Sequence, residues 1–153
     1  MEIVLAKSAG FCFGVRRATQ MAFEAASKHE NICSLGPVIH SPQVVKGLAE
    51  QGVKVVSKVE DIPPGSVIVR SHGITSEEME KIHESNLTIV DATCPFVKKA
   101  QEYAARLSDE GYTVVIVGEM EHPEVQGIVS YAGKALIHVV ADAQQALALP
   151  RMK

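Results

Sequence analysis

The sequence predicts an α/β fold of repeated small lobes, each with a mainly parallel sheet flanked by helices. Short runs of valine, isoleucine and leucine alternate along the chain with segments of helical periodicity, as in strand–helix–strand crossovers. These runs lack polar alternation, which is typical of parallel strands buried on both faces. One phrase also occurs twice, beginning at Cys12 and at Cys94, and the same interval separates His40 from His122. The repeat indicates two related units that face a shared site.

Seven strands are expected, each a short apolar run between glycine, proline or polar residues. They cover residues 2–6, 31–35, 53–56, 66–70, 87–91, 113–118 and 135–140. A lobe boundary is expected near Cys94, which gives a complete first lobe, 1–94, with about five strands. The second lobe, 95–153, has two strands and is expected to be incomplete, with apolar surface that favours self-association.

Six helices are expected between and after these strands. They cover residues 14–28, 42–51, 75–85, 95–110, 124–131 and 142–149. The first carries an apolar stripe, and the second is followed by Gly52, a helix-ending residue. The third opens with Thr75 and Glu78 at the spacing of a capping box. The fourth begins with Pro95 and ends before Gly111.

Composition limits the class of protein and its partners. The chain is 46% hydrophobic and 22% charged, enough to fill a core, and its net charge of −3 argues against nucleic acid as a partner. The N-terminus lacks a signal-peptide pattern and no apolar run is long enough to span a membrane, so a cytoplasmic protein is expected. Three cysteines, an odd number, do not indicate a disulfide framework in that compartment.

The reactive residues fall just past the carboxyl ends of predicted strands, at or near helix N-termini. They are Cys12, His40, His72, Cys94 and His122. Ligands of parallel sheets bind at this edge, and free N–H groups at helix N-termini favour thiolates and anions. We therefore expect the five residues to converge on one side of the molecule. Cys33 lies inside a strand and is interpreted as a plain buried thiol.

Two chemistries suit this set of side chains. Zinc accepts mixed cysteine and histidine ligands, but no close Cys-x-x-Cys pair occurs. An iron–sulfur cluster needs more thiolates than two, which a further copy of the cysteine phrase beyond residue 153 would supply. The histidines would then bind a phosphate-bearing substrate. Glu124 reads either as a surface acid at a helix start or as a proton donor. The basic pairs Arg16–Arg17 and Lys98–Lys99 read as ordinary helix charges.

Five motifs together resemble the 4-hydroxy-3-methylbut-2-enyl diphosphate reductase family of the non-mevalonate isoprenoid pathway. They are Gly10-Phe11-Cys12-Phe13-Gly14-Val15-Arg16-Arg17-Ala18, Ile39-His40-Ser41-Pro42-Gln43-Val44-Val45, Ser71-His72-Gly73, Asp91-Ala92-Thr93-Cys94-Pro95 and His122-Pro123-Glu124-Val125-Gln126-Gly127. The resemblance covers the whole chain but only the N-terminal half of the family's sequence, so a third lobe is expected to be absent from this chain. One departure is Ser41, where the family usually has asparagine.

The resemblance implies a role for each of these residues. Cys12 and Cys94 would be metal ligands, two of the three cysteines that hold a [4Fe–4S] cluster, with the third outside this chain. His40, His72 and His122 would bind the substrate diphosphate, and Glu124 would deliver protons. The implied oxidoreductase removes an allylic hydroxyl to form isopentenyl and dimethylallyl diphosphates, with electrons from a ferredoxin or flavodoxin. We expect the 153 residues alone to be inactive and to hold no intact cluster.

Two other functions compete with this interpretation. The chain could be a non-enzymatic phosphate-binding α/β module that keeps the histidine site but holds no cluster. It could also be a cysteine hydrolase or transferase, which needs one thiol paired with one histidine at hydrogen-bond distance.

Overall fold

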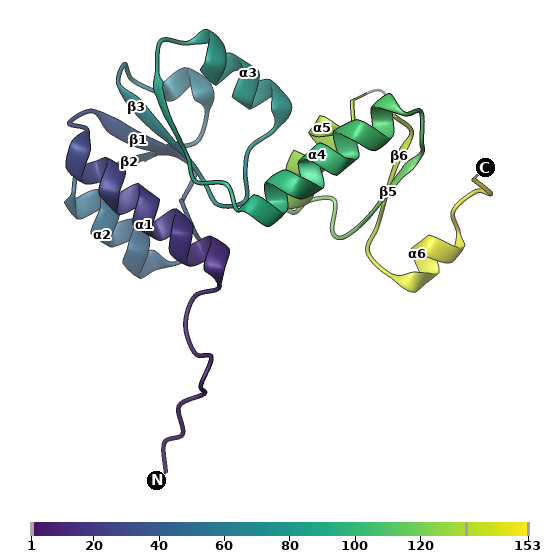
Figure 1. The fold of residues 1–153 in the computed structure, drawn as a ribbon, viewed down its shortest axis with the longest axis horizontal. Coiled ribbons are helices and arrows are strands. Elements are labelled where there is room, and N and C mark those ends of the chain that lie inside the picture. Colours follow the sequence, from purple (N-terminus) through teal and green to yellow (C-terminus); the bar gives the residue numbers. More distant parts are fainter. Residues whose placement is uncertain (1, 134, 153) are drawn as a thin grey trace.

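The computed structural model describes residues 2–133 and 135–152, and it shows two parallel sheets flanked by helices (Figure 1). The strand order of the larger sheet is β2-β1-β3-β4, and the smaller sheet pairs β5 with β6. The strands are β1 (Ile32–Leu35), β2 (Lys54–Val56), β3 (Ser66–Val69), β4 (Thr88–Asp91), β5 (Val114–Val117) and β6 (Ile137–Val140). The predicted α/β class with parallel sheets is confirmed.

The larger sheet is the middle layer of a three-layer unit. Its central strands β1 and β3 are buried along their whole length. One face of this sheet packs against α1 (Phe13–Lys28) and α2 (Pro42–Glu50), through Ile32 and Ile68 among others. The other face packs against α3 (Ser76–Glu84) and the short 3₁₀ helix Val59–Asp61. Burial on both faces explains why these strands are continuous apolar runs.

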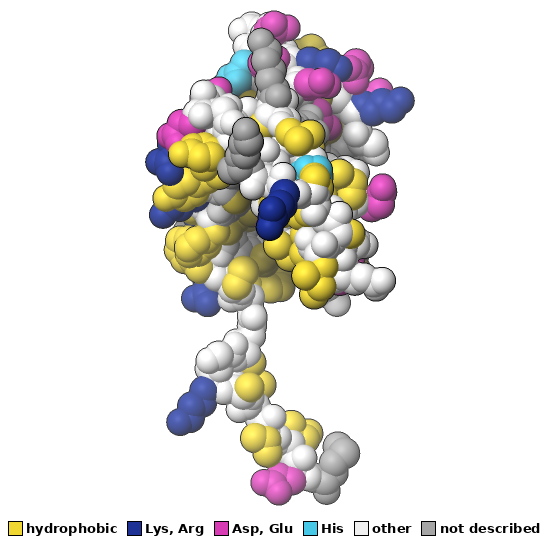
Figure 2. Space-filling view, turned by 90° about the vertical axis from the view of Figure 1, so that its right-hand side faces the viewer, with side chains coloured by type: hydrophobic (Ala, Val, Ile, Leu, Met, Phe, Trp, Pro, Cys, Tyr) yellow, Lys and Arg dark blue, Asp and Glu magenta, His cyan; other side chains and the backbone are white. Residues whose placement is uncertain are grey.

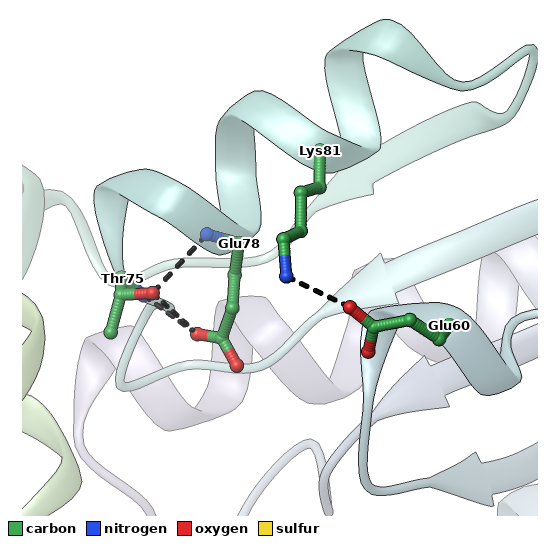
Figure 3. A network of polar contacts seen from close by, with 4 residues as sticks. All are labelled: Glu60, Thr75, Glu78 and Lys81. Carbon is green, nitrogen blue, oxygen red and sulfur yellow. Dashed lines mark hydrogen bonds and ion pairs between the residues drawn. The ribbon is translucent and has the colours of Figure 1, made fainter.

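The start of α3 is fixed by side-chain contacts, as its sequence predicts (Figure 3). Thr75 Oγ1 accepts a hydrogen bond from the Glu78 N–H at 3.2 Å, and the Glu78 carboxylate accepts one from the Thr75 N–H at 2.8 Å. This capping box satisfies N–H groups that have no partner inside the helix. At the surface, Lys81 of α3 pairs with Glu60 of the 3₁₀ helix at 2.8 Å. The capping box therefore fixes the point at which the loop after β3 enters α3.

The strand predicted at residues 2–6 is wrong. The segment is extended but pairs with no described strand, and Ile3, Val4 and Leu5 are each more than 80% exposed. It leads away from the start of α1 and projects from the body of the molecule (Figure 1). An apolar run makes a strand only where a sheet edge offers hydrogen bonds and a surface to cover it. The larger sheet thus has four strands instead of about five.

The smaller sheet is covered mainly on one face. That face packs against α4 (Pro95–Asp109) and α5 (Pro123–Tyr131), where Val114 meets Ala104 and Ala132. On the other face Val115 and Val117 of β5 are exposed, whereas Val140 of β6 is buried and the short helix α6 (Ala143–Leu147) packs against β6. Figure 2 views the molecule from this end and shows hydrophobic side chains on its surface. Self-association through such surface stays a prediction, as does the lobe division at residues 94 and 95.

The remaining predicted strands and helices all occur, with bounds that differ by a few residues. Within the described residues, no helix has both the length and the apolar character needed to cross a lipid bilayer.

Candidate functional site

The larger sheet has a topological switch point at the carboxyl ends of β1 and β3. The chain leaves β1 through α2 on one face and leaves β3 through α3 on the other, so the strand order reverses between these two neighbours. Loops that diverge in this way leave a crevice, which is the usual ligand position of open parallel sheets. His40 lies in the loop after β1 and His72 in the loop after β3, and their ring centroids are 4.7 Å apart.

His122 joins this pair from the smaller sheet. It follows β5 and directly precedes α5, and its ring stands 5.8 Å from that of His72, at 78° to it. The Nδ1 atom of His122 accepts a hydrogen bond from the Glu124 N–H at 3.2 Å and thereby caps α5. In the neutral ring the proton then resides on Nε2, which is free to donate to a ligand. The structure thus brings the three predicted histidines together, and we call them the histidine cluster.

The environment of His72 disfavours the protonated form of its imidazole. His72 is half-buried at the centre of the histidine cluster, and burial lowers the pKa of this imidazole. The neighbouring His40, His122 and Arg70 lower the pKa further, because each disfavours another positive charge. An anion among the rings would reverse this effect, since it would stabilise the protonated imidazole.

Backbone hydrogen bonds hold three site loops in register beyond the ends of the strands. The Ser71 N–H donates to the carbonyl of Val38 at 3.0 Å, and the Cys94 N–H donates to the carbonyl of Ser71 at 2.9 Å. The loops that carry His40, His72 and Cys94 therefore continue the parallel ladder of β1, β3 and β4. Their spacing follows from the sheet.

The two predicted metal ligands occupy equivalent positions in the repeat. Cys12 is the N-cap residue of α1 and Cys94 is the N-cap residue of α4, and neither side chain caps its own helix. A Cβ atom placed on Gly14 would lie 2.5 Å from Cys94 Sγ, so this thiol rests against the first turn of α1. Cys12, two residues before Gly14, is exposed, and Cys94 is partly exposed. Both thiols therefore stand at helix N-termini.

Cys33 differs from the other two cysteines in every respect. It is buried inside β1 in the apolar layer beneath α3, and burial raises the pKa of its thiol. It is the plain buried thiol that its sequence position indicates.

Within residues 2–133 and 135–152, no group of three histidine, cysteine or acidic side chains has the arrangement needed to hold a metal ion.

Glu124 lies in the first turn of α5 and is partly buried. Together with His122, Glu119 and two neighbours it lines a cavity of about 350 Å³. A carboxylate at this position can exchange protons with a ligand held by His122. The geometry allows the predicted proton-donor role but does not test it.

Two basic residues that the sequence interpretation assigned to the helix surface support the Cys94 loop instead. Arg17 of α1 donates from Nη1 to the carbonyl of Thr93 at 3.1 Å, and Lys98 of α4 forms an ion pair with Asp91. Asp91 also accepts from the Thr93 N–H at 3.0 Å. Burial opposes ionisation of Asp91, but the bonds from Lys98 and Thr93 outweigh it and lower the pKa of the carboxyl. In the sequence, the basic pair that follows each repeated cysteine was the feature that could have indicated this supporting role.

Comparison with known proteins gives one consistent result. The family model described as LytB protein matches residues 3–152. A curated 4-hydroxy-3-methylbut-2-enyl diphosphate reductase from Syntrophotalea carbinolica is 65% identical over 98% of this chain and 54% of its own length. One from Geobacter sulfurreducens is 63% identical over 100% of this chain and 54% of its own length. The chain therefore spans about half the length of the curated relatives it matches.

Two solved structures share the fold. One, described as (E)-4-hydroxy-3-methyl-but-2-enyl diphosphate reductase, is 41% identical with a TM-score of 0.79, over 95% of this chain and 52% of its own length. The E-1-hydroxy-2-methyl-but-2-enyl-4-diphosphate reductase from Plasmodium falciparum is 28% identical with a TM-score of 0.88, over 95% of this chain and 46% of its own. The family match, which runs almost from end to end, and these likenesses agree with the motif resemblance. The chain belongs to the LytB protein family.

Proposed function

We propose that the protein represented by this chain reduces 4-hydroxy-3-methylbut-2-enyl diphosphate to isopentenyl and dimethylallyl diphosphates. The observation that carries this proposal is the histidine cluster beside the Cys94 loop, in a chain whose relatives bear the name of that reductase. In the reaction the allylic carbon–oxygen bond breaks, two electrons and two protons enter, and the hydroxyl leaves as water. Because the chain spans about half of its relatives, we expect the 153 residues alone to be inactive.

Cys12 and Cys94 fit two of the ligand positions of a [4Fe–4S] cluster. Both are thiols at helix N-termini, and Gly14 leaves space at the Cys94 sulfur that a Cβ atom would fill. A third cysteine ligand would come from residues outside this chain. When bound, such a cluster supplies the two electrons and an open iron that polarises the hydroxyl as a Lewis acid.

The histidine cluster would bind the diphosphate and so position the reacting carbon. His122 presents Nε2–H to an oxygen, because its Nδ1 is engaged by the Glu124 N–H. His72 gains a proton more readily once an anion is present, which turns a neutral contact into a charge-assisted one. The N-termini of α2 and α5, next to His40 and His122, add the positive ends of their helix dipoles. This binding energy acts far from the bond that breaks.

Glu124 would move the protons. It lies two residues after His122, in the first turn of α5, and lines the same cavity. The electron donor would be a ferredoxin or a flavodoxin, and the enzyme would work in the cytoplasm.

A non-enzymatic phosphate-binding module is the second candidate for these 153 residues. It is favoured by the observation that all three histidines of the cluster lie in this chain and meet without any further residue. A thiol hydrolase is not favoured, because no hydrogen bond among the described residues joins a cysteine to a histidine.

The test compares the chain with a chimera that adds the remaining residues of the Syntrophotalea carbinolica relative. After anaerobic reconstitution with iron and sulfide, the chimera should hold about four irons per monomer and turn over the substrate. The 153-residue chain should do neither, and Cys94→Ser in the chimera should abolish both. A chimera that binds the cluster but leaves the substrate unreduced would contradict the proposed function.

The role of Glu124 is tested in the same chimera. Glu124→Gln keeps the shape and removes the acid, so binding should stay nearly unchanged while turnover slows. The matched control is Glu119→Gln, which changes an acid of the same cavity outside the helix. Equal turnover in both variants would remove Glu124 from the proton path.

A further inference from the structure

Gln101 of α4 is a buried polar residue that the proposed mechanism does not use. Its side chain is 6% exposed and lies at the junction of the two sheets. Within the described part of the chain its Nε2 atom is buried and has no hydrogen-bond partner. A buried donor without a partner costs stability, so its hydrogen bonding does not explain its presence. The explanation has to come from the space that the side chain fills.

The amide of Gln101 lies between two glycines of the site motifs. A Cβ atom on Gly73, the residue after His72, would lie 2.8 Å from Gln101 Nε2. A Cβ atom on Gly127, in the helix that begins after His122, would lie 3.4 Å from the same atom. Gly73 also has a φ of +74°, which a side chain rarely adopts. The Gln101 amide therefore fills the gap between the His72 loop and α5.

We propose that Gln101 is a positioning residue, a spacer that sets the separation of His72 and His122. The His72 loop belongs to the larger sheet, whereas His122 is held by α5 against α4. Two hydrogen bonds also join α3 to α5: the Ser76 N–H donates to Ser130 Oγ at 2.9 Å, and Ser76 Oγ donates to the Ser130 carbonyl at 3.0 Å. Those bonds fix the far end of α5, and the Gln101 amide fixes the end nearer the histidines.

The spacer role predicts that volume matters and the amide does not. Gln101→Met keeps the length of the side chain without its polar group, whereas Gln101→Ala leaves a void into which α5 can settle. The matched control is Ala104→Gly, also buried in α4 but packed against Val114 and Ala132 in the core beneath the smaller sheet. This control weakens the same helix without touching Gly73 or Gly127.

The experiment measures the histidine cluster directly in the 153-residue chain. One readout is the NMR contact between the ring protons of His72 and His122, and the other is affinity for inorganic pyrophosphate. Gln101→Ala should lose the ring contact and weaken pyrophosphate binding by about tenfold or more, because binding groups shifted by about 1 Å lose much of their effect. Gln101→Met and Ala104→Gly should retain both the contact and the affinity.

The pyrophosphate readout rests on the proposed function, whereas the ring contact does not. The two readouts therefore distinguish a failure of the spacer from a failure of the proposed function. If the unmodified chain does not bind pyrophosphate, the diphosphate role fails, but the ring contact still tests the spacer. The spacer is overturned if Gln101→Ala keeps the contact, or if Gln101→Met loses it as Gln101→Ala does. A loss of equal size in Ala104→Gly would show that general loosening of α4 is responsible, and would overturn it too.

Discussion

The two sheets support the histidine cluster in different ways. In the larger sheet, β1 and β3 are buried on both faces, and backbone hydrogen bonds extend their ladder through the loops of His40 and His72. The smaller sheet is covered mainly on one face, and it presents His122 through the packing of α5 on α4. Backbone bonds thus fix two of the imidazoles, while side-chain packing places the third.

The largest expected effect compares the cores of the two sheets. Ile68 of β3 is fully buried, so Ile68→Ala should cost about 3–4 kcal/mol of unfolding free energy. Ile116 of β5 is only partly buried, and Ile116→Ala should cost about 1–2 kcal/mol. Urea unfolding measures both. Equal losses of unfolding free energy would show that the smaller sheet is as well packed as the larger one, and would contradict the difference between the two sheets.

Glycines at the starts and interiors of helices should respond in opposite directions. Gly14→Ala would place a methyl group 2.5 Å from Cys94 Sγ, and this overpacking should cost about 1–3 kcal/mol. Gly47→Ala, inside α2, meets only the ring end of Phe23 at 3.2 Å, so it should stabilise the chain by up to about 1 kcal/mol. Thermal unfolding gives the sign. Faster alkylation of Cys94 in Gly14→Ala would confirm that its thiol has been displaced.

Arg17 and Arg16 test whether the Cys94 loop depends on side chains of α1. Arg17→Met removes the bond to the Thr93 carbonyl and should cost about 1–2 kcal/mol. Among the described residues, Arg16 bonds only to the exposed Phe11 carbonyl, so Arg16→Met should change stability by less than about 0.5 kcal/mol. Chemical denaturation of the two variants gives the comparison. A larger loss of stability in Arg16→Met than in Arg17→Met would show that Arg16, and not Arg17, supports the Cys94 loop.

The smallest expected effect is the pH dependence that His72 adds. Its folded-state pKa lies below its value of 6.5 in the unfolded chain, so the unfolded state binds more protons as pH falls. Stability from this residue is therefore fully present above about pH 6.5 and declines as pH falls from there toward the lower folded-state pKa. His72→Gln should flatten this part of the curve in urea unfolding between neutral and mildly acidic pH. The exposed His83 provides the control, and the decline should persist in His83→Gln.

Local signals in the sequence were sufficient for most of the fold. The capping box at Thr75 and Glu78, the proline starts of α2 and α4 and the apolar runs of β1 and β3 are short-range patterns, and all predict the observed elements. The segment 2–6 carries the same apolar signal and yet forms no strand. Its case shows that a strand also requires a partner edge, which no local pattern encodes.

The sequence by itself determined which residues stand at the carboxyl edge, because strand ends, helix starts and the repeated phrase locate His40, His72, Cys94 and His122. Only the tertiary structure decided what surrounds them. The contacts of Arg17 with Thr93 and of Gln101 with Gly73 and Gly127 join elements that are distant along the chain. Such contacts depend on how helices pack on sheets, and a basic or amide side chain on a helix carries no local sign of the partner it will meet.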